Sequence, residues 1–87
     1  MMFNVYLIQD VKSSYQPCLL TFENDAMAKR WFGQLYRDSV DRDPNGVYAT
    51  YPEDFRLIRI GILNVDDGSF SSFEHQFIIS MSNFVEV

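Results

Sequence analysis

The chain has 87 residues and a net charge of −5, and 47% of its residues are hydrophobic. This length predicts a single domain over residues 1–87, and the lone cysteine excludes an internal disulfide bond. The sequence has no apolar run of membrane-spanning length and no signal-peptide pattern at its start, so we expect a protein of the cytoplasm that does not bind membranes.

Two short strands and a polar loop open the chain. Residues 3–9 alternate in polarity and are rich in strand-forming types, which predicts the first strand. Residues 10–16 are polar and predict a loop. Pro17 then begins a second strand at residues 18–22, and the two strands could pair as a hairpin with a long loop.

The clearest element is an amphipathic helix at about residues 25–39, which Asn24 or Asp25 caps. Six apolar residues recur at the spacing of one helix face: Met27, Ala28, Trp31, Phe32, Leu35 and Tyr36. Gly33 falls on the opposite, polar face, where it costs the helix up to about 1 kcal/mol relative to alanine. We therefore expect Gly33 to be exposed and to allow a close approach by something outside the protein.

The longest apolar run, residues 56–65, predicts the central strand of a sheet. Side chains alternate between the two faces of a strand. One face carries Ile58, Ile60 and Ile62, and we expect it to meet the helix. The helix residues expected to pack on it are Met27, Trp31, Phe32 and Leu35. The other face carries Phe55, Leu57, Arg59, Gly61, Leu63 and Val65.

Turn signals flank this strand on both sides. Pro52 can start a single helical turn before it. Asp67-Gly68 after it is typical of a hairpin, because glycine adopts positive φ freely. Residues 70–77 then form the returning strand. Residues 78–87 contain strand-forming types with weak alternation, which indicates either a fifth strand or an extended arm.

These elements predict an α+β fold, with an antiparallel sheet of four to five strands and one amphipathic helix packed on one face. A single helix covers one face, so the other side of the central strand would expose a large apolar patch. A two-fold partner is the commonest way to cover such a patch. We therefore expect a homodimer whose interface contains Phe55, Leu57, Leu63 and Val65.

Patterns that could indicate catalysis or metal binding have simpler explanations. Residues 41–46 match the start of a calcium loop, but Pro52 stands where a bidentate glutamate is required. Cys18 would need His75 as its base, and the sequence does not bring the two together. The acidic pairs at 53–54 and 66–67 are ordinary turn residues. We therefore expect no catalytic residue, metal or cofactor, and a protein that is not an enzyme.

The basic residues leave two interpretations open. Lys29, Arg30 and Arg37 share the polar face of the helix, and Arg59 lies on the central strand. Cations contact phosphates and aromatic rings stack on bases, so these four cations could form a nucleic-acid surface. Alternatively, the cations are a solvated helix face and most aromatic residues are core. The negative net charge counts against strong nonspecific binding, so any binding is expected to be weak.

Short motifs follow one another in a particular order along the chain. They are Asn4-Val5-Tyr6, Asn24-Asp25-Ala26, Trp31-Phe32, Tyr51-Pro52-Glu53-Asp54-Phe55, Leu57, Arg59-Ile60-Gly61 and Asp66-Asp67-Gly68. This order resembles the small non-structural protein of gokushoviruses, the single-stranded-DNA phages of the microvirus group. The resemblance covers nearly the whole chain and is weaker at residues 41–50 and after Phe77.

The resemblance implies an accessory role in the replication of single-stranded viral DNA or in its packaging, in the cytoplasm of a host bacterium. The partner would be the DNA or a phage replication or capsid protein. The alternative is a structural or scaffold-like interaction module with no nucleic-acid contact. No catalytic residue follows from the resemblance. The resemblance assigns no functional role to its motif positions, which only match the family pattern. These positions are Pro52, Glu53, Asp54, Arg59 and Gly61.

Overall fold

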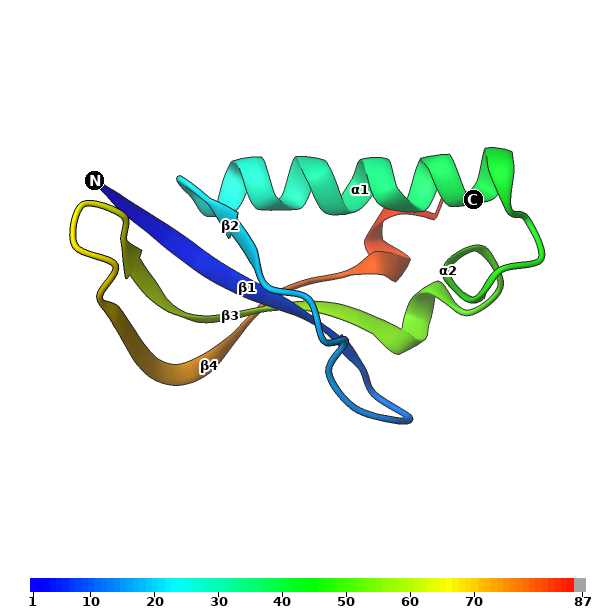
Figure 1. The fold of residues 1–87 in the computed structure, drawn as a ribbon. Helices are drawn as coiled ribbons and strands as arrows, with labels where there is room; N and C mark the ends of the chain where they lie inside the picture. The colour runs from blue at the N-terminus through cyan, green and yellow to red at the C-terminus, as the bar shows by residue number, and fades with distance from the viewer. Residues whose placement is uncertain (86–87) are drawn as a thin grey trace.

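A computed structural model describes residues 1–85 and contains one sheet and one long helix (Figure 1). The elements are β1 (Met2–Asp10), β2 (Leu20–Phe22), α1 (Asp25–Arg42), α2 (Val47–Thr50), the 3-10 helix η1 (Pro52–Asp54), β3 (Phe55–Asn64), β4 (Phe70–Ser80) and the 3-10 helix η2 (Met81–Phe84). The four strands are antiparallel and lie in the order β2-β1-β3-β4. The predicted α+β fold is confirmed.

The first two strands form the predicted hairpin with a long loop. β1 pairs with β2 over a short register that includes Tyr6 opposite Leu20. β2 starts later than predicted, because the backbone N–H of Cys18 donates to the carbonyl of Gln16 at 2.8 Å. This local hydrogen bond keeps the chain in a turn at Cys18, so only the last residues of the segment reach β1.

α1 begins where the sequence predicts and ends a little later. The side chain of Asn24 accepts a hydrogen bond from the backbone N–H of Met27 at 2.9 Å, which is the geometry of an N-cap. The helix continues past Ser39 to Arg42. Pro44 then disfavours helical backbone at the residue before it, and the helix stops there.

The β3–β4 hairpin turns at the predicted Asp-Gly pair. Gly68 has φ 75°, which glycine adopts without the strain that a side chain would bring. Asn64 accepts a hydrogen bond from the backbone N–H of Asp66, and Asp67 accepts one from that of Ser69, both at 2.9 Å. The Ser69 N–H also lowers the pKa of the exposed Asp67 carboxyl, because it stabilises the charged form.

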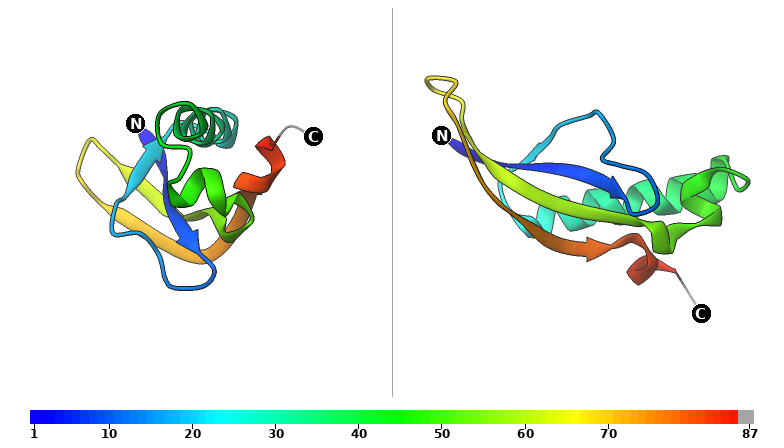
Figure 2. Two further views of the ribbon diagram at one scale, coloured as in Figure 1. Left: turned by 90° about the vertical axis from the view of Figure 1, so that its right-hand side faces the viewer. Right: turned by 90° about the horizontal axis from the view of Figure 1, so that it is seen from below.

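α1 lies along one face of a strongly twisted sheet (Figures 1 and 2). The molecule is elongated, with extents of 42 × 23 × 19 Å. At one end, α2 and η1 lead the chain from α1 into β3, and Pro52 opens η1 as predicted. No helix within residues 1–85 is long and apolar enough to cross a membrane.

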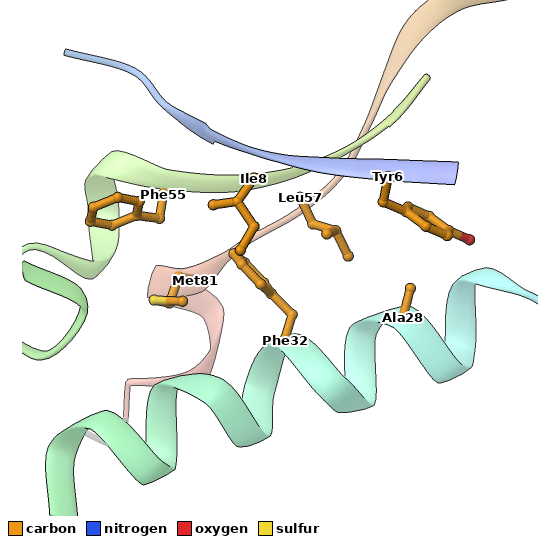
Figure 3. Packing of buried hydrophobic residues seen from close by; sticks show 7 residues of the cluster. All are labelled: Tyr6, Ile8, Ala28, Phe32, Phe55, Leu57 and Met81. Atoms are coloured by element: carbon orange, nitrogen blue, oxygen red, sulfur yellow. The ribbon is translucent and has the colours of Figure 1, made fainter. Parts of the chain in front are cut away.

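The core lies between α1 and the sheet (Figure 3). Its buried members are Tyr6, Ile8, Ala28, Phe32, Phe55, Leu57 and Met81. β3 therefore turns Phe55 and Leu57 toward the helix, and the prediction that Ile58, Ile60 and Ile62 form the helix-facing side is wrong. Of the four helix residues expected to pack there, Phe32 is buried, Trp31 and Leu35 are half-buried and Met27 is exposed.

The register of β3 against β1 decides which side of β3 meets α1. Leu57 lies opposite Ile8, and residues opposite one another share a face of the sheet. Ile8 points toward α1 (Figure 3), so Leu57 does as well. Beyond Arg59, a bulge leaves Ile60 without a partner on β1, which changes the alternation from there on. Ile62 consequently no longer shares a face with Ile58.

Two of the four predicted dimer-interface residues are inside the protein. Phe55 is 3% exposed and Leu57 is 0% exposed, both beneath α1. The prediction that these two residues form a dimer interface is therefore wrong, because the helix already covers the face on which they lie. Leu63 is half-buried at the end of β3, and Val65, which follows it, is exposed.

The C-terminal segment completes the core instead of adding a strand. η2 follows β4 directly and lies close to α1 (Figure 1). It brings the fully buried Met81 and the ring of Phe84 to the helix. Residues 78–80 continue β4 and residues 81–84 form η2, so the predicted fifth strand or arm does not form within residues 78–85. Residues 86–87 lie outside the described part. Gly33 was predicted to be exposed, but it is buried because Phe84 covers it.

Candidate nucleic-acid interface

Three of the four predicted cations lie on one side of α1. Lys29 lies four residues before Gly33, and Arg37 lies four residues after it. Arg30 lies three residues before Gly33. Residues three and four apart are neighbours on a helix surface, so the three cations surround Gly33. All three side chains are exposed.

The charges of these three cations are not neutralised within the described part of the chain. The ion pairs among residues 1–85 are Met1 amino group–Asp66, Lys12–Asp54 and Arg59–Asp25. Two acidic residues share the same half of α1: Asp38 accepts a hydrogen bond from Gln34 at 2.8 Å, and Asp41 follows Arg37 by one turn. Lys29, Arg30 and Arg37 are therefore exposed cations that have no ion-pair partner among residues 1–85.

An aromatic ring lies in the middle of these cations. A Cβ atom added to Gly33 would stand 2.7 Å from the ring of Phe84, which is closer than van der Waals contact allows. Gly33 is thus required for the ring to approach the helix backbone. The same ring packs edge-on against Phe32, with the ring centroids 6.3 Å apart and the planes at 74°.

A hollow of about 370 Å³ opens beside this ring, between η2 and the C-terminal half of α1. It is lined by Tyr36, Arg37, Val40, Asp41 and Phe84. The wall combines two aromatic rings, a guanidinium and a carboxylate. These are the groups that proteins use to stack on a base, to contact a phosphate and to accept hydrogen bonds from a base edge.

Sequence reasoning found the cations of this site but missed Phe84. The C-terminal segment has weak alternation, and its tertiary position could not be read from its pattern. The available signal was Gly33, a glycine in the interior of a well-formed helix, which often marks a close contact. The sequence predicts room for an external group at Gly33, whereas the space is occupied by Phe84 of the chain itself.

Arg59, the fourth predicted cation, lies apart in a network at the start of α1. Its guanidinium is 3.4 Å from the carboxylate of Asp25, also contacts Gln76, and lies over the ring of Phe73 with 5.6 Å between guanidinium and ring centroid. Its Nε is buried with no hydrogen-bond partner in the described residues. These contacts hold Arg59 against the sheet and α1, whereas the other three cations project from the helix.

The same network holds a buried tyrosine. The hydroxyl of Tyr6 donates to Asp25 at 2.6 Å, and Tyr6 is 0% exposed. Burial, together with the hydrogen bond to Asp25, raises the pKa of Tyr6 to about 12, because both disfavour the phenolate. Tyr6, Asp25 and Arg59 thus join β1, α1 and β3 at one end of the core.

The other chemically suggestive residues have ordinary surroundings. The hydroxyl of Tyr15 lies 2.9 Å from Nδ1 of His75, and Cys18 is exposed with its Sγ 4.0 Å from the Leu19 carbonyl. Among residues 1–85, no group of three or more His, Cys, Asp and Glu side chains could hold a metal ion. We assign no functional role to Tyr15, Cys18 or His75.

A second hollow, of about 210 Å³, lies on the sheet face away from α1. Its lining residues are Val5, Leu19, Thr21, Ile60, Leu63 and Phe70. Leu19 is 65% exposed and Phe70 is 49% exposed, so its two rims project into solvent. A Cβ at Gly61 would stand 2.5 Å from the backbone carbonyl oxygen of Ser71 and 2.7 Å from the ring of Phe70, which explains a glycine in the middle of β3. This face is apolar and has no helix over it.

Comparison with known proteins gives one match. The model of a family described as Phage ORF5 protein matches residues 3–84. The matched segment extends from β1 to the end of η2 and includes Phe84. No curated protein and no solved structure matches the chain.

Proposed function

Because the chain belongs to the Phage ORF5 protein family, we propose that this small phage protein is a non-enzymatic accessory in the replication or packaging of single-stranded viral DNA. It acts by binding the DNA weakly through α1, in the cytoplasm of a host bacterium. The motif order described above supports a narrower assignment, to the small non-structural protein of gokushoviruses. No catalytic residue, metal or cofactor takes part in this role.

One observation carries the proposal. Lys29, Arg30 and Arg37 are exposed around a single helix position, and their charges are free of ion pairs within residues 1–85. In a protein of net charge −5, a local group of unpaired cations favours the approach of a polyanion to that side alone. Arg59 contributes less, because Asp25 already pairs with its charge.

The test is a salt titration of single-stranded DNA binding, followed by fluorescence anisotropy of a labelled oligonucleotide. Each phosphate that the protein neutralises contributes about 0.7 to the slope of log affinity against log salt concentration. We expect wild-type protein to bind at low salt with a measurable slope. Lys29→Glu with Arg30→Glu should remove the binding and flatten the slope.

A matched control separates a local effect from a change in net charge. Lys12→Glu with Arg56→Glu makes the same charge change away from the candidate interface, since Lys12 pairs with Asp54 and Arg56 lies over the ring of Phe77. This variant should keep most of the wild-type affinity. Absence of wild-type binding even at low salt, or equal loss in both variants, would contradict the proposal.

The apolar sheet face favours a second candidate function. A phage replication or capsid protein, or a second copy of this chain, could dock over the hollow that Leu19 and Phe70 border. The protein would then be a structural or scaffold-like interaction module with no nucleic-acid contact. Failure of the anisotropy experiment, together with a stable complex formed through this face, would favour that function.

A further inference from the structure

We propose that the hollow beside Phe84 binds one unpaired base of single-stranded DNA and prefers a base that carries an exocyclic amino group, such as cytosine. This inference rests on the proposed function and adds a defined base site to it. The cations around Gly33 would attract any single strand. The hollow would then distinguish one base from another.

The shape and the lining of the hollow fit an aromatic guest. Its volume of about 370 Å³ lies within the range of small-molecule sites, which is about 300–1,000 Å³. Tyr36 and Phe84 both contribute to its wall, and each is half-buried, so their rings are fixed at one side and accessible at the other. A base inserted there would stack on aromatic surface, which is a sequence-tolerant interaction.

The charged groups of the wall orient the guest. Arg37 lies in the wall and belongs to the group of cations around Gly33, so a phosphate next to the inserted base would contact Arg37. Asp41 lies one turn further along α1 and repels phosphate. The sugar–phosphate backbone would therefore run on the Arg37 side, and the edge of the base would point toward Asp41.

Asp41 is the group that would discriminate between bases. A carboxylate accepts hydrogen bonds, and cytosine offers two N–H bonds on its exocyclic amino group. Thymine offers one ring N–H between two carbonyl oxygens, and these oxygens repel a carboxylate. Cytosine and thymine are pyrimidines of similar size, so a difference in their binding reports on Asp41 more than on stacking.

Gly33 gives the hollow its aromatic wall. The ring of Phe84 sits where a side chain at position 33 would stand, at 2.7 Å from the added Cβ. The contact with Phe32 also holds the ring in place. The wall is thus held by close packing, which favours stacking because little side-chain freedom is lost when a base binds.

The experiment compares oligo(dC) with oligo(dT) of equal length on wild-type protein, by anisotropy at low salt. We expect oligo(dC) to bind at least about ten-fold more tightly, as one hydrogen bond to a charged acceptor would give. Equal affinities, or tighter binding of oligo(dT), would overturn the base site and leave the proposed function standing. Absence of binding to both would overturn the two together.

Two pairs of variants locate the discrimination. Asp41→Ala should bind the two oligonucleotides with equal affinity, whereas Asp38→Ala, with the same charge change on the same helix, should keep the preference for oligo(dC).

Phe84→Leu should lower the affinity for both oligonucleotides on the order of ten-fold by loss of stacking. Phe70→Leu makes the same change on the far sheet face and should have no effect. Loss of the preference in Asp38→Ala, or equal binding by Phe84→Leu and wild type, would overturn the base site.

A ligand-side measurement keeps the test independent of variant folding. An oligo(dC) with abasic positions retains its phosphates and lacks bases at those positions. Wild-type protein should bind it more weakly than the intact oligonucleotide, with the same salt slope. Equal affinity for the two would show that no base enters the hollow.

Discussion

Gly33 controls the contact between α1 and the C-terminal segment. At an ordinary helix position, alanine in place of glycine stabilises the helix by up to about 1 kcal/mol. Here the added methyl group would overlap the ring of Phe84. Gly33 therefore lowers the helix propensity of α1 but allows η2 to close the core, and the position of the Phe84 ring depends on it.

The first prediction is a change of sign at this position. Gly33→Ala should lower the free energy of unfolding by about 1 kcal/mol in the wild-type background, because the overpacking exceeds the gain in propensity. In a Phe84→Ala background the same substitution should raise it by up to about 1 kcal/mol, because only the propensity gain remains. Urea unfolding of the four proteins measures both effects. The same sign in both backgrounds would contradict the contact.

Tyr6 gives a prediction about pH. Its pKa is raised from 10.0 to about 12 in the folded protein. Below pH 10, Tyr6 is protonated in both the folded and the unfolded state, and its full contribution to the free energy of unfolding is present. As the pH rises from 10 toward 12, the unfolded state loses this proton first, so stability falls. The difference between the two pKa values corresponds to about 3 kcal/mol.

Tyr6→Phe is the control for this effect. Urea unfolding at about pH 9 and about pH 12 should show a larger loss of stability in wild type than in Tyr6→Phe. The two proteins differ only at position 6, so the contributions of all other residues cancel in the comparison. An equal loss in the two proteins would mean that Tyr6 ionises as freely in the folded state as in the unfolded one.

At the scale of elements, the packing of α1 rests on Phe32 more than on Trp31. Phe32 is 0% exposed in the centre of the core, whereas Trp31 is half-buried and packs beside Phe22 with 5.8 Å between ring centroids. Phe32→Ala should cost about 3–5 kcal/mol, the range for a buried aromatic residue, and Trp31→Ala should cost less. Chemical denaturation of both variants measures this order. A greater cost for Trp31→Ala would mean that the core is centred on Trp31 and would contradict the packing described above.

The elements themselves could be predicted because their signals are local. Asn24 caps α1, Pro52 opens the turn before β3 and Gly68 takes the positive φ of the hairpin. Each of these roles depends on a few neighbouring residues, which the sequence shows directly. The last residue of α1 could not be predicted in the same way, because its last turn has no stop signal before Pro44.

The orientation of β3 could not be predicted, because both of its faces are apolar. Leu57 and Ile58 are both buried, on opposite faces of the sheet. Alternation therefore identifies two faces without showing which of them meets α1. The bulge at Ile60 then shifts the pattern for the second half of the strand. The neighbouring Gly61 is the sequence signal for it, because a lone glycine inside a strand pattern indicates either a bulge or a close approach. Two residues expected at a dimer interface, Phe55 and Leu57, proved to be core for this reason.

The hollow beside Phe84 could not be predicted for a different reason. Its wall combines α1 with η2, which lies at the other end of the chain. Periodicity identified the cations, because they share a helix face. It could not place the C-terminal segment, whose position depends on how Met81 fits the core.

At the scale of the whole molecule, the apolar hollow on the sheet face away from α1 supports the proposal of a homodimer. Leu63 lines the hollow together with Leu19 and Phe70, and Val65 is exposed directly after β3. The place of Leu63 and Val65 in a dimer interface stays a prediction. β4 adds an outer edge of eleven residues, and unpaired strand edges favour association. A second copy could cover the apolar hollow by the same face, as two-fold symmetry requires.

Light scattering at micromolar concentration tests the dimer. Wild type should show about twice the mass of one 10.2 kDa chain. Leu19→Lys with Val65→Lys should give a folded monomer, because both side chains are exposed and neither belongs to the core under α1. Lys29→Glu, on the opposite side of the molecule, should remain dimeric. A wild-type mass near that of one chain would exclude the dimer.

The pairing of β1 with β3 also sets the order in which the chain can fold. The β1–β2 hairpin, α1 and the β3–β4 hairpin form from neighbouring residues, but β1 meets β3 only after a loop from Asp10 to Phe55 has closed. The entropy lost in closing a loop grows with its length, and folds dominated by such distant pairs form more slowly than helical bundles. During synthesis on a ribosome, the inner edge of β1 stays without its partner until β3 has emerged. The first strand to be made is therefore the one that waits longest for its central partner.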